Sequence, residues 1–168
     1  MWGNQGYGQP KRKPVKPALV TAVDMLARQE YSEKRLFEKL MAKGYEEEEA
    51  SAAIARLQEK HYLNDAESCP RRFNYLYMDS SYSVRQICEK LKQKGYPSAL
   101  VKSCIPDDRE AVGEREYEKA LRVLTSKYKR SQDKQKLMAA LFRRGYQSSA
   151  IYRAVNAFLA GQEDEIDE

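Results

Sequence analysis

The sequence predicts an all-α protein in which three tandem three-helix repeats form an elongated, curved, solenoid-like array. A six-residue motif that begins with Leu and ends with Gly-Tyr occurs three times, at residues 40–45, 91–96 and 141–146. Its glycines are 51 and 50 residues apart, a period typical of helical repeat arrays. Apolar residues recur at helical spacing through most of the 168 residues, and no segment shows the alternation of a β-strand.

The repeated motif has the chemistry of a helix end. Its glycine can adopt the left-handed conformation that follows the last helical residue, and the next tyrosine would pack against the leucine five residues earlier. The residue before each glycine is a cation that complements the negative end of the helix dipole, namely Lys43, Lys94 or Arg144. The motif is therefore interpreted as a structural device that ends one helix of each repeat.

The first repeat is expected at residues 18–64. Its first helix should run over about 18–28, with an inward face formed by Leu19, Ala22, Val23 and Leu26. Ser32 is expected to cap the second helix, which ends at Gly44. The third helix begins in the run of four glutamates at 46–49, where negative charge favours a helix amino terminus.

The second repeat, at residues 65–106, follows the same order. The inward face of its first helix includes Phe73, Leu76 and Tyr77. Ser83 and Gln86 have the spacing of a capping box at the start of the second helix. Pro97 suits the first turn of the third helix, and Pro106 closes that helix.

The third repeat, at residues 107–160, has a longer first helix, expected at about 108–128. Asp133 stands four residues before an apolar position, as the serine caps do in the other repeats, so we expect it to cap the second helix. The third helix is expected to end before Gly161.

Charge is distributed unevenly along the chain. Residues 1–17 carry four cations and no acid and are expected to form a disordered basic arm, whereas 161–168 carry five acids and no base and should form an acidic disordered tail. The net charge is −2 over 18–63, +3 over 64–105 and +5 over 106–160. An anionic partner is therefore expected to bind the second and third repeats.

Several classes of protein are not supported by the sequence. No run of 18 apolar residues and no apolar signal segment occurs, so we expect a cytoplasmic protein. The three cysteines do not form paired metal-ligand spacings, although Cys69, near a helix start, could be more reactive than the other two. His61 is the only histidine and lacks an orienting partner. We therefore predict no catalytic residue, no metal site and no cofactor.

The residues expected to bind a partner are cations before and along the second helices of the second and third repeats. They are Arg71, Arg72, Arg85, Lys90, Lys92, Lys94, Lys127, Lys129, Arg130, Arg143 and Arg144. Tyr75 and Tyr152 could stack or hydrogen-bond at the same interface. The alternative interpretation is a solvated basic face that has no ligand.

In order and spacing, these motifs resemble the RecX family of recombinase regulators. The resemblance spans about residues 18–160 and is carried by Ala27 to Ser32 followed by Leu36, Leu40 to Tyr45, Tyr62 to Asp65, Ile87 with Leu91 to Gly95, and Lys136 to Tyr146. Asn64 departs from the Tyr-Leu-Asp-Asp segment that the family commonly has, and residues 66–70 lack its usual Arg-Phe-Ala pattern.

The resemblance implies a bacterial, monomeric protein that binds RecA and its nucleoprotein filament, in the helical groove of that filament. Such a protein modulates, and mostly inhibits, the ATPase, strand-exchange and coprotease activities of RecA, and so acts in recombination, DNA repair and the SOS response. Some members bind single- or double-stranded DNA directly. Two alternatives stay open: a helical DNA-binding protein that affects recombination indirectly, and a non-catalytic protein-interaction scaffold.

Overall fold

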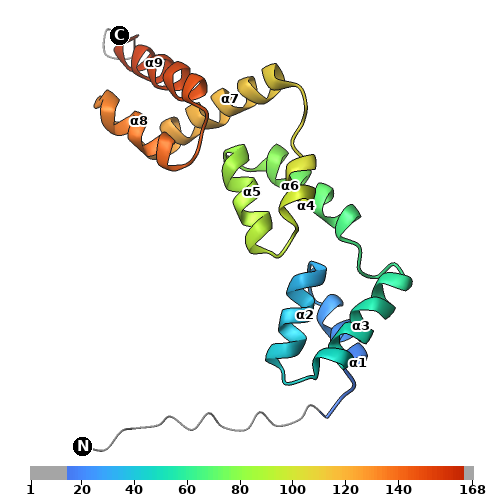
Figure 1. Cartoon of the computed structure of the whole chain (residues 1–168). Coiled ribbons are helices and arrows are strands. Elements are labelled where there is room, and N and C mark those ends of the chain that lie inside the picture. The colour runs from blue at the N-terminus through green and yellow to red at the C-terminus, as the bar shows by residue number, and fades with distance from the viewer. Residues whose placement is uncertain (1–14, 165–168) are drawn as a thin grey trace, which may run out of the picture. The chain divides into compact units, whose positions relative to one another are not determined.

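The computed structural model describes residues 15–164, with side chains up to Gln162. In that range it contains nine α-helices and no β-strand (Figure 1), which confirms the predicted all-α class. The chain forms two compact units, Met1–Asp65 and Ala66–Glu168. Most of the expected basic arm lies outside the described residues, and so do the last four residues of the expected acidic tail.

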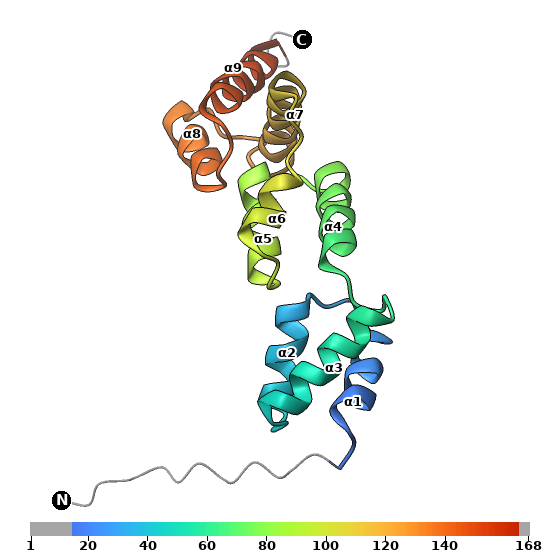
Figure 2. The same ribbon diagram turned by 45° about the vertical axis from the view of Figure 1, so that its right-hand side comes forward.

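The first unit contains α1 (Ala18–Leu26), α2 (Glu33–Ala42) and α3 (Glu47–Glu59) (Figure 2). These helices enclose one hydrophobic cluster, whose fully or nearly fully buried members are Ala18, Ala22, Leu36, Leu40, Tyr45, Ala50, Ala53, Leu57 and Leu63. The predicted face of α1 is partly wrong. Leu19 and Val23 are 37% and 47% exposed, because α1 packs on the cluster through its small alanines.

The second unit begins with α4 (Asp65–Asp79, all but its first residue), α5 (Val84–Gln93) and α6 (Ser98–Ser103). Their buried residues form a second cluster, made of Cys69, Phe73, Ile87, Cys88, Leu91, Tyr96 and Val101. Within it, the rings of Phe73 and Tyr77 stack with centroids 5.7 Å apart.

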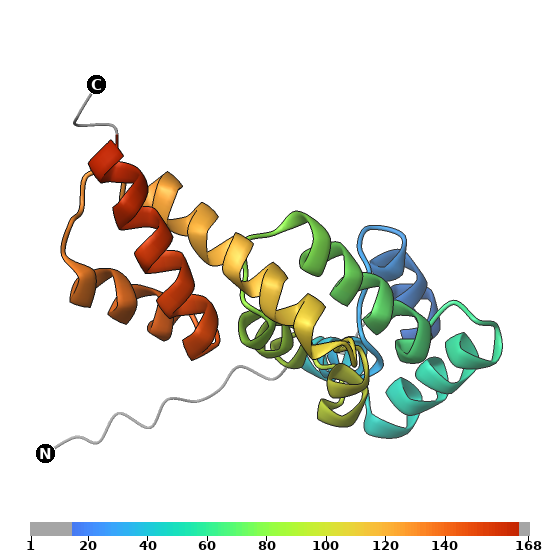
Figure 3. The ribbon, with the colours of Figure 1, turned by 90° about the horizontal axis from the view of Figure 1, so that it is seen from above.

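The unit continues with α7 (Arg109–Lys127), α8 (Lys134–Arg143) and α9 (Ser148–Asp164). Helices α7 and α9 run alongside each other (Figure 3) and share a third cluster with α8. The predicted end of the last helix before Gly161 is wrong, since α9 continues to Asp164. Gly161 does not adopt the positive φ that ends the other helices.

All three Gly-Tyr motifs end helices as predicted. The φ angles of Gly44, Gly95 and Gly145 are +94°, +96° and +79°. In each copy the glycine N–H donates to the carbonyl three residues back, and the tyrosine N–H donates to the leucine carbonyl at 3.2–3.4 Å, which is the Schellman pattern. The predicted caps are also present. Ser32 accepts from the Arg35 N–H, Asp133 accepts from the Lys136 N–H, and Ser83 forms a capping box with Gln86.

The tyrosine hydroxyls of the motif make different connections. Tyr45 donates to the Lys16 carbonyl at 2.8 Å, just before α1, and Tyr96 is hydrogen-bonded to Ser68 near the start of α4 at 3.1 Å. Tyr146 instead donates to the Ser81 carbonyl, in the segment before α5. The third copy of the motif therefore ties the α7–α9 group to the α4–α6 group.

A buried ion pair on α7 also connects the α7–α9 group to the α4–α6 group, and we call this connection the joint. Glu116, only 1% exposed, accepts from the backbone N–H of Val84 at 2.7 Å and of Gln147 at 3.2 Å. Arg115 donates to the carbonyls of Tyr77 and Tyr82, and its Nη1 lies 3.6 Å from Glu116 Oε1. Burial raises the pKa of Glu116 and lowers that of Arg115. One charged pair thus fixes the first turn of α5 and the start of α9 relative to α7.

The three hydrophobic clusters agree with three groups of three helices, but the residue boundaries assigned to the repeats stay a prediction.

Candidate functional site

Two adjoining hollows lie along α5 in the second unit. One, of about 400 Å³, is lined by Arg72, Tyr75, Leu76, Tyr82, Lys90, Gln93 and Lys94. The other, of about 510 Å³, is lined by Arg85, Gln86, Glu89, Lys90, Gln93, Phe142, Arg143, Arg144 and Gly145. Because both include Lys90 and Gln93, we treat them as one surface, the α5 groove.

The α5 groove depends on the close approach of α5 to the end of α8. A Cβ atom added to Gly145 would lie 2.8 Å from Cδ and 3.1 Å from Cβ of Arg85, closer than real Cβ atoms pack. The Ser83 hydroxyl, at the start of α5, donates to the Arg144 carbonyl at 2.6 Å. The glycine that ends α8 therefore also brings Arg85 beside Arg143 and Arg144.

The groove is strongly basic. Its cations are Arg72, Arg85, Lys90, Lys94, Arg143 and Arg144, and its only acid is Glu89. Glu89 pairs with Lys92 at 3.2 Å. Among the side chains described, residues 15–162, no carboxylate forms an ion pair with Arg85, Arg143 or Arg144. Such a surface attracts phosphate groups or acidic side chains.

Exposed aromatic rings accompany these cations. Tyr75, which the sequence had marked for an interface, and Phe142 are each 67% exposed. Phe142 was not predicted, because its place in the repeated motif is filled by Met41 and Lys92 in the other copies. The Lys90 ammonium lies 4.5 Å from the centroid of the Tyr82 ring. Cations beside exposed rings suit binding to nucleic-acid strands or to protein surfaces.

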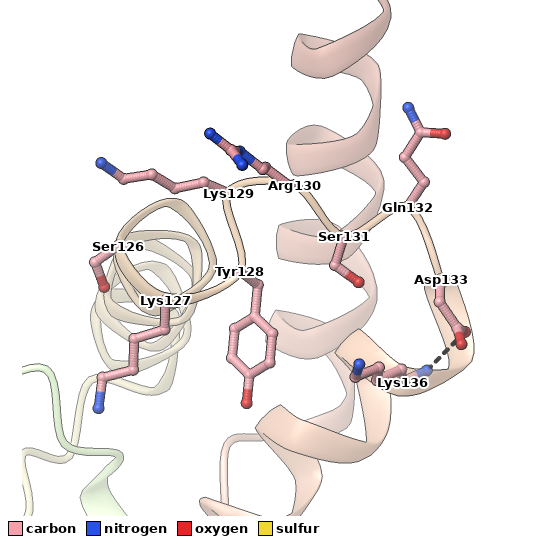
Figure 4. Close-up of a pocket in the computed structure, with 9 residues that line it drawn as sticks. All are labelled: Ser126, Lys127, Tyr128, Lys129, Arg130, Ser131, Gln132, Asp133 and Lys136. Carbon is pink, nitrogen blue, oxygen red and sulfur yellow. Dashed lines mark hydrogen bonds between the residues drawn. The ribbon is translucent and has the colours of Figure 1, made fainter.

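The segment between α7 and α8 forms a separate basic region. A hollow of about 810 Å³ is lined by Ser126, Lys127, Tyr128, Lys129, Arg130, Ser131, Gln132, Asp133 and Lys136. Figure 4 shows Lys129 and Arg130 extending in the same direction from this segment, and Lys127 extending away from them. Asp133 is engaged as the cap of α8, where it accepts from the Lys136 N–H at 3.0 Å.

The structure thus divides the eleven predicted binding residues. Six line the α5 groove, and Lys127, Lys129 and Arg130 line the hollow before α8. Arg71 and Lys92 line neither. Tyr152 is 56% exposed, with the Lys134 ammonium 5.2 Å from its ring centroid.

The residues weighed for metal binding or reactivity in the sequence can now be placed in the structure. Among the side chains of residues 15–162, no three His, Cys, Asp or Glu residues are grouped as metal ligands. His61 follows the end of α3 at φ +58°. Cys69 is fully buried, contrary to the expectation that it could be reactive, and burial raises the pKa of the Cys88 thiol. None of the helices in this range is long and apolar enough to cross a membrane.

Models of the RecX family match two parts of the chain. The first three-helix domain of RecX matches residues 18–57, from the start of α1 to near the end of α3. The third three-helix domain matches residues 114–155, from within α7 to the middle of α9.

Curated relatives and solved structures agree with these matches. The chain is 30% identical over 147 residues to "Regulatory protein RecX" of Caldanaerobacter subterraneus subsp. tengcongensis, which covers 84% of this chain and 71% of that protein. It is 32% identical to a protein of that name from Thermus thermophilus, over 77% of this chain and 83% of the relative. The fold is similar to that of RecX from Lactobacillus salivarius, with a TM-score of 0.68 at 17% identity over 84% and 94% of the two chains. The chain therefore belongs to the RecX family of regulatory proteins.

Proposed function

We propose that this protein binds RecA and its nucleoprotein filament in the helical groove, and that it inhibits the ATPase, strand-exchange and coprotease activities of RecA without catalysis of its own. Its membership of a family of regulatory proteins supports a regulatory role. The observation that carries the choice of surface is the α5 groove, where six cations from α4, α5 and the end of α8 gather around exposed Tyr75 and Phe142.

The chemistry of the α5 groove fits a filament that contains nucleic acid. Arg85, Arg143 and Arg144, which pair with no carboxylate of the described residues, can contact phosphates. Those contacts release counterions, so binding should weaken steeply as salt rises. The exposed rings can pack on protein or on bases. The buried Arg115–Glu116 joint holds the contributing helices together, so the groove needs little reorganisation on binding.

The test is DNA-dependent ATP hydrolysis by RecA, measured with increasing concentrations of this protein. We expect the hydrolysis rate to fall towards a plateau, and the concentration for half-inhibition to rise with salt. A RecA rate unchanged at saturating protein would contradict the proposal.

The second candidate is a DNA-binding protein that affects recombination indirectly, which the basic groove also favours. Fluorescence anisotropy separates the two candidates. Binding to a labelled oligonucleotide alone is compared with binding to a RecA filament that leaves no DNA free. Our proposal expects tighter binding to the filament, whereas equal or stronger binding to bare DNA favours the second candidate.

A further inference from the structure

Two segments of opposite charge lie outside the α5 groove, one between α7 and α8 and the other at the carboxyl end of the sequence. Residues 127–136 carry five cations and one acid, and we call this segment the basic loop. Its cations are Lys127, Lys129, Arg130, Lys134 and Lys136. The acidic segment, residues 163–168, carries five acids and no base.

The carboxyl end of α9 is attached directly to the basic loop. The Gln162 side-chain amide donates to the Lys129 carbonyl at 2.9 Å. Gln162 and Lys129 also line a common hollow of about 460 Å³ with Phe158. Phe158 is buried in the α7–α9 cluster, so the Gln162–Lys129 contact lies next to the hydrophobic core. The acidic segment therefore starts one residue beyond a side chain bonded to the basic loop.

The distances favour contact between the two segments. Six residues span at most about 20 Å when fully extended, and opposite charges attract effectively within about 8 Å at physiological salt. The side chains of Lys129 and Arg130 extend from the loop in one direction (Figure 4). Up to Gln162, no carboxylate forms an ion pair with any cation of the basic loop. Asp133 is already engaged by the Lys136 N–H.

We propose that the acidic segment 163–168 docks on the basic loop 127–136 and competes there with the phosphate backbone of single-stranded nucleic acid. The acidic segment carries five carboxylates and the basic loop a net charge of +4, so the charges of the two segments nearly cancel. The acidic segment weakens binding of a short or loosely held strand, and a strand that binds the loop displaces it. This inference needs no contact with RecA.

Zero-length carbodiimide crosslinking followed by mass spectrometry tests the contact itself. We expect crosslinks from the acidic segment to Lys127 or Lys129 in the full chain, and at least about a threefold loss of these crosslinks when a saturating twenty-nucleotide oligothymidine is added. No crosslinks to the basic loop would overturn the proposal, and so would crosslinks that the oligonucleotide leaves unchanged.

Fluorescence anisotropy with the same oligonucleotide tests the competition. In the variant E163Q/D164N/E165Q/D167N/E168Q we expect binding about fivefold tighter at low salt, with the gain shrinking as salt screens the charges. The gain should largely disappear when K127Q, K129Q and R130Q are also present, because the basic loop then keeps a net charge of only +1.

The matched control removes five exposed acids elsewhere, as E46Q/E47Q/E48Q/E67Q/E118Q. It changes the net charge equally and should tighten binding by less than about twofold. An equal gain in the control, or an undiminished gain in the K127Q/K129Q/R130Q background, would show a general charge effect and overturn the inference. Both experiments omit RecA, so their outcome is independent of the ATPase test.

Discussion

His61 adopts the left-handed backbone conformation at the end of a helix that glycine adopts at the three repeated motifs. It follows the end of α3 at φ +58°, and the next residue, Tyr62, donates its N–H to the Leu57 carbonyl at 2.9 Å. Residues with a Cβ enter this conformation at a cost of about 1–2 kcal/mol. The sequence places His61 at a helix end, but its left-handed conformation could not be predicted because no glycine marks it.

Replacing His61 with glycine should therefore stabilise the first unit. We expect H61G to raise the free energy of unfolding by about 0.5–1 kcal/mol, since part of the relief is offset by the greater freedom of glycine in the unfolded chain. Urea denaturation followed by circular dichroism measures this change. H61A, which keeps a Cβ, is the control and should give no gain, and a loss of stability in H61G would contradict the assignment.

Asp65 makes the stability of the first unit depend on pH. Its side chain accepts from the Glu33 N–H at 3.0 Å, which lowers its pKa. Burial, with a smaller contribution from the Glu33 carboxylate, outweighs this hydrogen bond and raises the pKa of Asp65 from 3.8 to about 6. The folded state therefore binds the proton more tightly than the unfolded state. This stabilisation is complete below about pH 4 and is lost as the pH rises through 6.

The variant D65N isolates this effect, because Asn can still accept from the Glu33 N–H but does not titrate. The unfolding free energy of the native chain, measured relative to D65N, should fall by about 1–2 kcal/mol between pH 4 and pH 7. Urea titrations at a series of pH values give this difference. A difference that is constant with pH, or that rises, would contradict the raised pKa.

At the scale of elements, the Arg115–Glu116 pair decides how α7 holds α5 and α9. In E116Q one oxygen can still accept from the Val84 N–H, but the new amide group cannot accept from the Gln147 N–H. Arg115 also loses the charge that offsets its burial. We expect a loss of about 3 kcal/mol in the unfolding free energy of the second unit, measured by urea denaturation.

E114Q is the matched control on the same helix. Glu114 pairs with Arg153 at 2.8 Å, but both side chains are about half exposed, so its loss should cost less than about 1 kcal/mol. Equal effects of the two substitutions would mean that Glu116 has no special role in the joint.

The helices themselves were largely predictable, because caps, glycine stops and apolar periodicity all act within a few residues of one another. The orientation of α1 was not. Its sequence carries one stripe with Ala18 and Ala22 and another with Leu19 and Val23, and only the packing partners decide between them. Ala18 and Ala22 are small and allow α1 to pack more closely on the cluster of the first unit. Similarly, Gly161 looks like a helix stop, yet α9 continues past it to Asp164, and the Gln162 side chain donates to the Lys129 carbonyl.

For the whole molecule, the sequence revealed the charge but not its arrangement. Eleven cations could be named from their positions before and along the second helices of the second and third repeats, and six of them line the α5 groove. This grouping depends on Gly145 bringing the end of α8 against Arg85, a contact between residues 60 positions apart. Glu116 resembles any exposed helical glutamate in the sequence, because its burial arises only when two three-helix groups join.

The most direct test of the central claim compares three proteins as inhibitors of RecA ATP hydrolysis on single-stranded DNA. They are the native chain, the groove variant R85Q/R143Q/R144Q, and the control K34Q/K39Q/K43Q, which removes the same charge from exposed positions in the first unit. We predict that the groove variant needs at least about tenfold more protein for half-inhibition, whereas the control stays within about twofold of the native chain. Full inhibition by the groove variant at the native concentration would contradict the claim that the α5 groove binds the filament.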